Sequence, residues 1–234
     1  MKGKLYLIPS TLGNDSAIKV IPKGVIEIVN TINYFIVENV RTARRFLLSI
    51  GIETPVDDLT FFTLNVNTRP EEIYSYLDPV LKSNIGILSE AGVPCVADPG
   101  AEVVKLAHLK NIEIIPLVGP SSILMALMAS GMNGQNFSFV GYLPIRSSDR
   151  IKRIKQLEKR SYQENQSQIF IETPYRNNQI FKDIINSCSH GTSLCIATNI
   201  TLPGESIRTL TINDWKKQHP EINKKPTVFI LKRD

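Results

Sequence analysis

The chain has 234 residues, 42% hydrophobic and 21% charged, with 27 Lys and Arg against 22 Asp and Glu, so its formal net charge is +5. This is an ordinary globular composition, and at this length one large domain or two small ones bury enough surface to fold without disulfides or a metal.

The three cysteines, Cys95, Cys188 and Cys195, form no CxxC pair and are odd in number, which predicts a reducing, cytoplasmic setting. The N-terminus lacks the long apolar region of a signal peptide. The uncharged stretch of residues 114–135 is interrupted by two prolines and predicts strand, turn and helix rather than a membrane span. The three histidines have no ligand spacing, so no metal site is expected.

Short apolar runs alternate with helical patterns in the first half of the chain. The predicted strands cover residues 5–8, 34–37, 85–88 and 112–117, and the predicted helices cover 41–50 and 101–110. Such strands indicate a largely parallel sheet covered on both faces. Ligands bind beyond the carboxyl ends of such strands, which draws attention to the loops after Ile8, Val37 and Leu88.

A second unit is predicted after Leu117, giving domains 1–117 and 118–234 and the fold class α/β with two α/β domains. Its first helix, 121–130, is expected to bury Ile123, Leu124, Leu127 and Met128. The remaining predicted elements are strands 137–142, 168–172, 193–198 and 227–231 and a basic helix with the apolar stripe Ile151, Ile154 and Leu157. The mixed spacing indicates antiparallel pairs in this sheet.

The run SEAGVPCVADPG, residues 89–100, directly follows a predicted strand. Its glycines let backbone amides approach a ligand, and its prolines fix φ. Both properties suit a loop that binds a nucleotide-like molecule. Two tight turns that only lead into the next helix are the alternative.

Two further loops follow strands, at residues 9–14 and 119–122. Neither GxGxxG nor GxxxxGK[ST] occurs, which argues against a conventional NAD or ATP site. The second loop opens a helix whose N-terminus suits a carboxylate or ribose hydroxyls, although Ser121 also suits a plain helix cap.

Glu38 and Glu172 each follow a predicted strand and precede an arginine, Arg41 and Arg176 respectively. Both carboxylates are candidates for orienting a substrate or removing a proton. The alternative for Glu38 is a helix-entry acid paired with Arg41 or Arg44.

Seven basic residues against two acidic ones lie between Arg146 and Arg160. Such a helix either binds nucleic-acid phosphates, with Arg150 and Arg153 as candidate contacts, or is a solvated face.

Several motifs together resemble the tetrapyrrole-methylase superfamily of S-adenosylmethionine (SAM) methyltransferases, and within it the bacterial family that methylates a ribose 2′-hydroxyl of small-subunit ribosomal RNA. SEAGVPCVADPG resembles SDAGTP followed by DPG, IPLVGPSS resembles VxPLPGPSA, and VGYLP resembles xGFLP. ENVRTARRFLLSIGI and IFIETPYR are similar to EDTRTxxxLLxxxGI and IFYESPHR. The match covers almost the whole chain.

The resemblance implies two α/β domains with SAM in the cleft between them, a homodimer, and ribosomal RNA or the small ribosomal subunit as partner. It assigns SAM contacts to Pro9, Leu12, Ser89, Glu90, Ala91, Gly92, Val93, Ser121, Ser122, Glu172, Ala197 and Pro226. Glu38 and Glu172 are the catalytic candidates, and the substrate contacts are Arg41, Arg150, Arg153 and Arg176.

The chain departs from the family pattern at positions that concern the acceptor. Residues 38–41 read ENVR in place of EDTR, so Asn39 and Val40 replace the Asp and Thr of the motif. Residues 197–202 read ATNITL in place of ARELTK. Three hypotheses therefore stand: a ribose 2′-O-methyltransferase, a methyltransferase for a small or peptide-borne acceptor, and a SAM-binding module without catalysis.

Overall fold

The computed structural model describes residues 2–13, 17–65 and 67–234, so that Asn14, the last residue of the predicted N-terminal loop, lies outside the described residues. The chain divides into two compact units, Met1–Ser121 and Ser122–Asp234, within a few residues of the predicted boundary.

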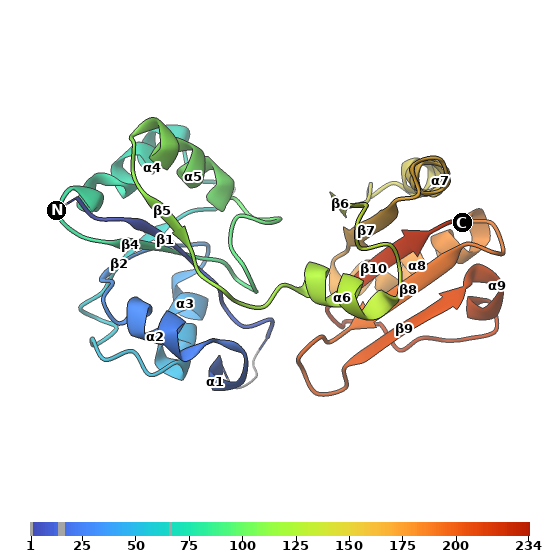
Figure 1. Cartoon of the computed structure of the whole chain (residues 1–234), viewed down its shortest axis with the longest axis horizontal. Coiled ribbons are helices and arrows are strands. Elements are labelled where there is room, and N and C mark those ends of the chain that lie inside the picture. Colours follow the sequence, from blue (N-terminus) through green and yellow to red (C-terminus); the bar gives the residue numbers. More distant parts are fainter. Residues whose placement is uncertain (1, 14–16, 66) are drawn as a thin grey trace. The chain divides into compact units, whose positions relative to one another are not determined.

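The sheet of the first unit is entirely parallel, where a largely parallel sheet was predicted, and its strand order is β3-β2-β4-β1-β5. Figure 1 shows β2, β4, β1 and β5. Its strands are β1 (Leu5–Ile8), β2 (Tyr34–Val37), β3 (Thr60–Thr63), β4 (Ile85–Leu88) and β5 (Ile114–Pro116). Its helices are α1 (Ala17–Val20), α2 (Lys23–Val29), α3 (Val40–Ser49), α4 (Pro70–Tyr76) and α5 (Gly100–Leu109), with a 3-10 turn at Asp78–Leu81. β3, α1, α2 and α4 were not predicted.

Both faces of this sheet are buried, which explains why its strands are almost wholly apolar. Phe35 and Val37 pack in one cluster with residues of α2 and α3, whereas Ile36 packs on the other face with residues of α4 and α5. Ile8 and Val37 are both in register with Leu88, so three neighbouring strands end at the same level. The loops that follow them are therefore brought to one edge.

The sheet of the second unit has the order β6-β7-β10-β8-β9. β6 and β7 are parallel and the other neighbours antiparallel, which confirms the predicted mixed sheet. Its strands are β6 (Phe137–Tyr142), β7 (Ser167–Ile171), β8 (Ser193–Thr198), β9 (Ser206–Thr211) and β10 (Thr227–Lys232). Its helices are α6 (Ser122–Ser130), α7 (Ser147–Glu164), α8 (Asn177–Ser187) and α9 (Ile212–Trp215), with a 3-10 turn at Pro174–Arg176.

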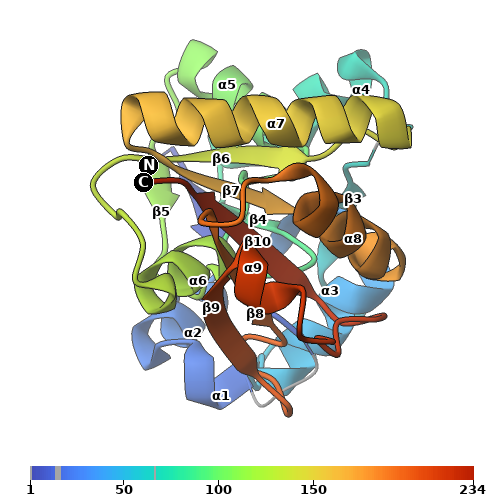
Figure 2. The same cartoon turned by 90° about the vertical axis from the view of Figure 1, so that its right-hand side faces the viewer.

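The core of the second unit joins α7, α8 and α9 to one face of the sheet (Figure 2). Ile154 of α7, Ile184 of α8 and Trp215 of α9 share this cluster with Phe170 and Phe229, whose rings stack. The predicted stripe on α7 is largely confirmed, since Ile154 and Leu157 are fully buried.

The predicted burial on α6 is wrong for two residues. Leu124 is 50% and Met128 82% exposed, while Ala126 and Leu127 are buried. α6 is apolar around most of its circumference, so periodicity alone cannot select the buried face. In the part of the chain that is described, no helix combines the length and apolarity needed to cross a membrane.

Candidate cofactor and catalytic site

Three loops meet at the carboxyl edge of the first sheet. The backbone N–H of Ser10 donates to the carbonyl of Gly92 (2.9 Å), and the N–H of Gly92 donates to the carbonyl of Thr11 (3.3 Å). The loop after β1 and the loop after β4 are thus paired through their backbones. These hydrogen bonds bring together Pro9, Leu12 and residues 89–93, which the resemblance assigns to SAM.

Gly92 allows this close approach. It has a φ of +75°, and a Cβ there would lie 2.9 Å from the carbonyl oxygen of Pro120 and 3.0 Å from Cδ2 of Leu12. A left-handed φ is accessible to glycine without the steric cost that a side chain imposes. A Cβ on Gly119 would likewise lie 2.2 Å from Cβ of Pro9. Only glycines let the third loop, after β5, pack against the other two.

Asp98 holds the rest of the loop after β4. Its carboxylate accepts hydrogen bonds from the backbone N–H of Cys95 and of Gly100, at 2.9 Å each. Between these anchors Cys95 and Ala97 have φ values of 67° and 65°, a conformation that costs a non-glycine residue about 1–2 kcal/mol. Backbone strain of this kind is commonly found at ligand clamps. Burial beside Asp98 raises the pKa of the Cys95 thiol to about 12, so this thiol is not an activated nucleophile.

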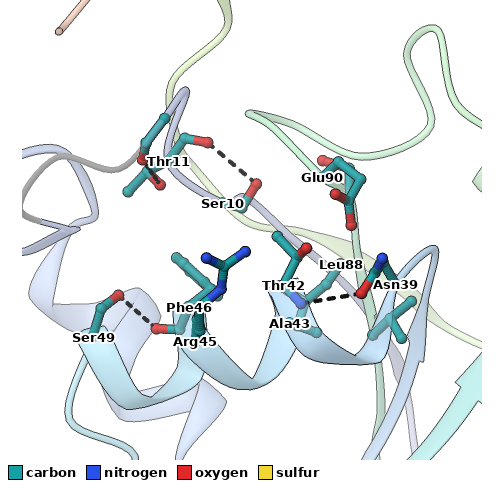
Figure 3. A pocket seen from close by; sticks show the side chains of 13 residues that line it. Ser10, Thr11, Asn39, Thr42, Ala43, Arg45, Phe46, Ser49, Leu88 and Glu90 are labelled. Atoms are coloured by element: carbon teal, nitrogen blue, oxygen red, sulfur yellow. Dashed lines mark hydrogen bonds between the residues drawn. The ribbon is translucent and has the colours of Figure 1, made fainter.

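A pocket of about 260 Å³ opens at the same edge, between α3 and the loops after β1 and β4 (Figure 3). Thr42, Arg45 and Ser49 of α3 line it opposite Ser10 and Thr11, and Ser89 and Glu90 complete it. Ser89 also donates a 3.0 Å hydrogen bond to the carbonyl of Gly92, which fixes the turn. The pocket therefore combines the predicted serine and glutamate with hydroxyls and a guanidinium from α3.

Glu38 follows β2 at this edge and is half-buried. Burial raises the pKa of its carboxyl, and the negative charges of Asp98 and Glu90 add to the increase, while a hydrogen bond from the backbone of Glu90 opposes it. A carboxylate with a raised pKa binds a proton more readily, as a general base requires. Glu38 is therefore chemically suited to remove a proton.

The alternative in which Glu38 pairs with a helix arginine is not supported. Among the described residues, Arg44 forms an ion pair with Asp57 (3.0 Å), and no ion pair joins Glu38 to Arg41, whose side chain is exposed. Asn39 instead caps α3, because its side-chain oxygen accepts hydrogen bonds from the N–H of Arg41 and Thr42. Asn caps a helix about as well as Asp, so this departure from the family motif removes a charge and keeps the cap.

The predicted residues of the second unit also gather at one sheet edge. Ile171 at the end of β7 and Ala197 near the end of β8 are both in register with Val228 of β10. The N–H of Asn199 donates to the carbonyl of Pro226 (2.9 Å). Glu172, Ala197 and Pro226 therefore share this edge, and Ser122 is the first residue of α6.

Glu172 is in a different state from Glu38. Its side chain is fully buried, and it forms an ion pair with Arg176, whose side chain is 22% exposed. The other carboxylate oxygen accepts a 2.8 Å hydrogen bond from the N–H of Thr173. Both oxygens are engaged, which suits a residue that positions its loop better than one that takes a proton.

Arg150 does not fit its predicted contact with substrate. Its side chain is 1% exposed, its guanidinium pairs with Asp183 at 2.6 Å, and it donates to the carbonyls of Pro144 and Ile145. The helical repeat places Arg150 on the inner face of α7, which composition could not reveal. Arg153, on the same helix, remains half-exposed.

Sequence reasoning missed Asp98, Thr42 and Arg45. The Asp-Pro-Gly order is typical of a carboxylate that caps its own turn and could have identified Asp98. Thr42, Arg45 and Ser49 lie three and four residues apart, a spacing that places them on one face of a helix.

A second cavity of about 390 Å³ lies in the second unit, between β9 and residues 218–225. None of the residues assigned to SAM lines it, although it is larger. We place the site at the first sheet, where strand ends, glycine-dependent packing and Glu38 coincide. No cluster of three or more metal-ligating side chains occurs among the described residues.

Relatives in sequence carry the name of a ribosomal RNA methyltransferase. A protein of Buchnera aphidicola subsp. Schizaphis graminum named "Ribosomal RNA small subunit methyltransferase I" is 30% identical over 233 residues, covering 98% of this chain and 78% of the relative. The protein of that name in Escherichia coli O157:H7 is 25% identical over 234 residues, covering 98% and 78%. No family model matches the chain.

Solved structures show the same fold at low identity. The methyltransferase CobJ matches with a TM-score of 0.64 and 16% identity, over 99% of this chain and 94% of that one. The cobalt precorrin-4 methyltransferase CbiF matches with a TM-score of 0.62 and 15% identity, over 98% and 94%. Because the Buchnera relative is 30% identical along nearly the whole chain, the chain belongs to the ribosomal RNA small subunit methyltransferase I family.

Proposed function

We propose that this protein is a SAM-dependent methyltransferase that transfers a methyl group to a ribose 2′-hydroxyl of small-subunit ribosomal RNA. The observation that carries the proposal is the juxtaposition of Glu38 with the three joined loops at the carboxyl edge of the first sheet. The name of the relatives supports the RNA acceptor.

The residues present fit SAM. The pocket of about 260 Å³ is slightly below the range of roughly 300–1,000 Å³ typical of small-molecule sites, so it suits part of the molecule. We assign Glu90 to the ribose hydroxyls as an acceptor and Arg45 to the carboxylate of the amino-acid portion. The remaining contacts are those assigned by the resemblance in both units.

SAM, when bound, supplies a methyl group already activated on a sulfonium sulfur. The chain has to hold the acceptor hydroxyl in line with that carbon, and positioning supplies much of the acceleration. As the acceptor oxygen bonds to the methyl carbon and the carbon–sulfur bond breaks, Glu38 takes the hydroxyl proton at a carboxylate oxygen. Glu172, ion-paired with Arg176, positions the loop after β7.

Arg41 is the cation that we assign to substrate near this edge, because its side chain is exposed. Arg176 remains a candidate through its 22% exposed side chain. We extend the proposal to a homodimer in the cytoplasm, as the resemblance and the cysteine content suggest.

The test combines binding and transfer in one preparation. Calorimetry measures SAM affinity, and methyl-labelled SAM is then incubated with small ribosomal subunits from cells that lack this protein. A 2′-O-methyl group removes the hydroxyl that attacks the neighbouring phosphodiester, so a labelled site that resists alkaline hydrolysis identifies ribose methylation.

Each outcome separates the hypotheses. Label in alkali-resistant ribosomal RNA, lost in the Glu38→Gln variant, supports the proposal. SAM binding with methyl transfer only to a tetrapyrrole or a protein would show that the acceptor is that molecule and not RNA. SAM binding without transfer to any of them would indicate a binding module, and no SAM binding would overturn the proposal.

A further inference from the structure

The outer face of α7 keeps the basic balance of its sequence, because folding buries one charge of each sign. Arg150 is buried against Asp183, and Glu158 is buried with its carboxylate bonded to the N–H of Ser189 (2.7 Å) and to the hydroxyl of Thr192. What remains outside is Arg146, Lys152, Arg153, Lys155, Lys159 and Arg160 against Asp149 and Glu164, so 6 − 2 gives +4.

Three lysines on this face, Lys152, Lys155 and Lys159, form a stripe along the helix. Their spacing of three and four residues places them on one side, and all three are exposed. Within the described residues none of the three has an ion pair, whereas Arg160 is paired with Glu164 at 3.0 Å. Their charges are therefore available to a partner.

An exposed aromatic ring continues the stripe. Tyr162 is 60% exposed, and the guanidinium of Arg233, from the end of β10, lies 5.3 Å from its ring centroid. Figure 2 shows α7 as a long helix at the border of its unit, with the C-terminus of the chain close to one of its ends. Positive charges beside an exposed ring suit a nucleic-acid strand, whose phosphates need cations and whose bases stack on aromatic faces.

We infer that Lys152, Lys155, Lys159 and the Tyr162–Arg233 pair form a docking surface for the backbone of the ribosomal RNA substrate, an inference that rests on the proposed function. From Lys152 to Lys159 the helix rises about 10 Å. This equals the axial rise of about three nucleotides of a stacked strand at roughly 3.4 Å each. The occupant is a segment of the ribosomal RNA backbone.

The experiment compares two triple variants of the full chain that remove the same charge. K152Q/K155Q/K159Q neutralises the stripe, and K216Q/K217Q/K224Q neutralises three exposed lysines elsewhere in the same unit. Gln has nearly the helix propensity of Lys, so α7 is kept. The apparent Kd for small ribosomal subunits is measured from 50 to 200 mM KCl, with SAM affinity measured in parallel.

We expect the stripe variant to bind subunits at least about tenfold more weakly and to reduce the slope of log K against log salt by about 2, since each phosphate contact contributes roughly 0.7 to that slope for a single strand. Its SAM affinity stays at the wild-type value. The control triple changes neither quantity by a comparable amount. Y162A weakens binding about fivefold to tenfold without changing the slope, because stacking is not ionic.

Equal effects of the two triple variants on subunit binding would show that only the net charge of the protein matters, and would overturn the proposed docking surface. An unchanged salt slope in the stripe variant would overturn it as well. In both cases wild-type methylation of the subunits still stands, so a failure here is distinct from a failure of the proposed function, in which the wild-type protein itself does not methylate RNA.

Discussion

Glu38 and Glu172 occupy matching places in the two units, and the fold gives them different chemistry. Each follows an apolar strand and precedes an arginine by three or four residues. Glu38 is half-buried near Asp98 and Glu90, and its pKa is raised. Glu172 is fully buried against Arg176. The lesson is that one local pattern yields a half-buried carboxyl with a raised pKa or a buried ion pair according to which charges lie beside it.

The largest expected effect tests the structural role of the Glu172 pair. Arg176→Ala leaves Glu172 buried and unpaired, which costs about 3–5 kcal/mol of unfolding free energy and lowers the melting temperature by roughly 10 °C. Adding Glu172→Gln to this variant restores part of the loss, because the uncompensated charge is removed. Thermal and urea unfolding measure both.

Arg41→Ala is the matched control in the first unit, since Arg41 is exposed and its expected change is within about 0.5 kcal/mol. If Arg41→Ala and Arg176→Ala destabilise the protein equally, the two motifs do not differ in the way described above.

The next effect concerns catalysis at Glu38. Glu38→Gln keeps the size of the side chain and removes the base, so kcat for RNA methylation falls about 100-fold while SAM affinity is unchanged. Under the proposed mechanism activity needs the ionised carboxylate, whose pKa is raised above the ordinary 4.5, so we expect the acid limb of the wild-type profile of kcat/KM above pH 4.5. Steady-state rates across pH check both points, and an identical acid limb in the variant would assign it to another group.

A smaller effect isolates the packing of the three loops. Gly92 and Gly51 both have a φ of +75°, yet a Cβ on Gly51 meets nothing within 4 Å. Alanine at either position destabilises the fold by about 1–2 kcal/mol because of the left-handed backbone. Only Gly92→Ala adds steric overlap of the new Cβ with Pro120 and Leu12. We expect Gly92→Ala to weaken SAM binding about tenfold and Gly51→Ala to leave it unchanged. Calorimetry on the two variants, beside their unfolding curves, tests this; equal SAM affinities would contradict it.

The smallest expected effect is on the free energy of unfolding. It measures how much the half-buried negative charge of Glu38 destabilises the fold. A carboxyl whose folded pKa is raised above the unfolded value loses stability as pH rises through that folded value. Glu38→Gln should therefore be more stable than wild type at pH 7, by roughly 0.5 kcal/mol because solvent screens a half-buried group, and equally stable below about pH 4. Urea unfolding at both pH values measures it, and a destabilised variant at pH 7 would mean that Glu38 holds a favourable interaction.

Strand positions were predictable because a strand covered on both faces must be apolar. The runs at 5–8, 34–37 and 85–88 coincide with β1, β2 and β4 for this reason. β3 was missed because its ends are polar, Thr60 and Thr63, as suits an edge strand. α6 was placed correctly, but its buried face was assigned wrongly because almost every residue on it is apolar.

The sequence by itself determined the α/β class, the parallel and mixed sheets and the strand ends at which the candidate site lies, since these follow from periodicity and local turn chemistry. Only the tertiary structure decided which charges lie beside Glu38 and Arg150 and how deeply Glu172 is buried. Asp98 near Glu38 and Asp183 against Arg150 come from other elements, whereas Arg176 is only four residues from Glu172. Electrostatic effects depend on distance and burial in space, and neither can be read from spacing along the chain.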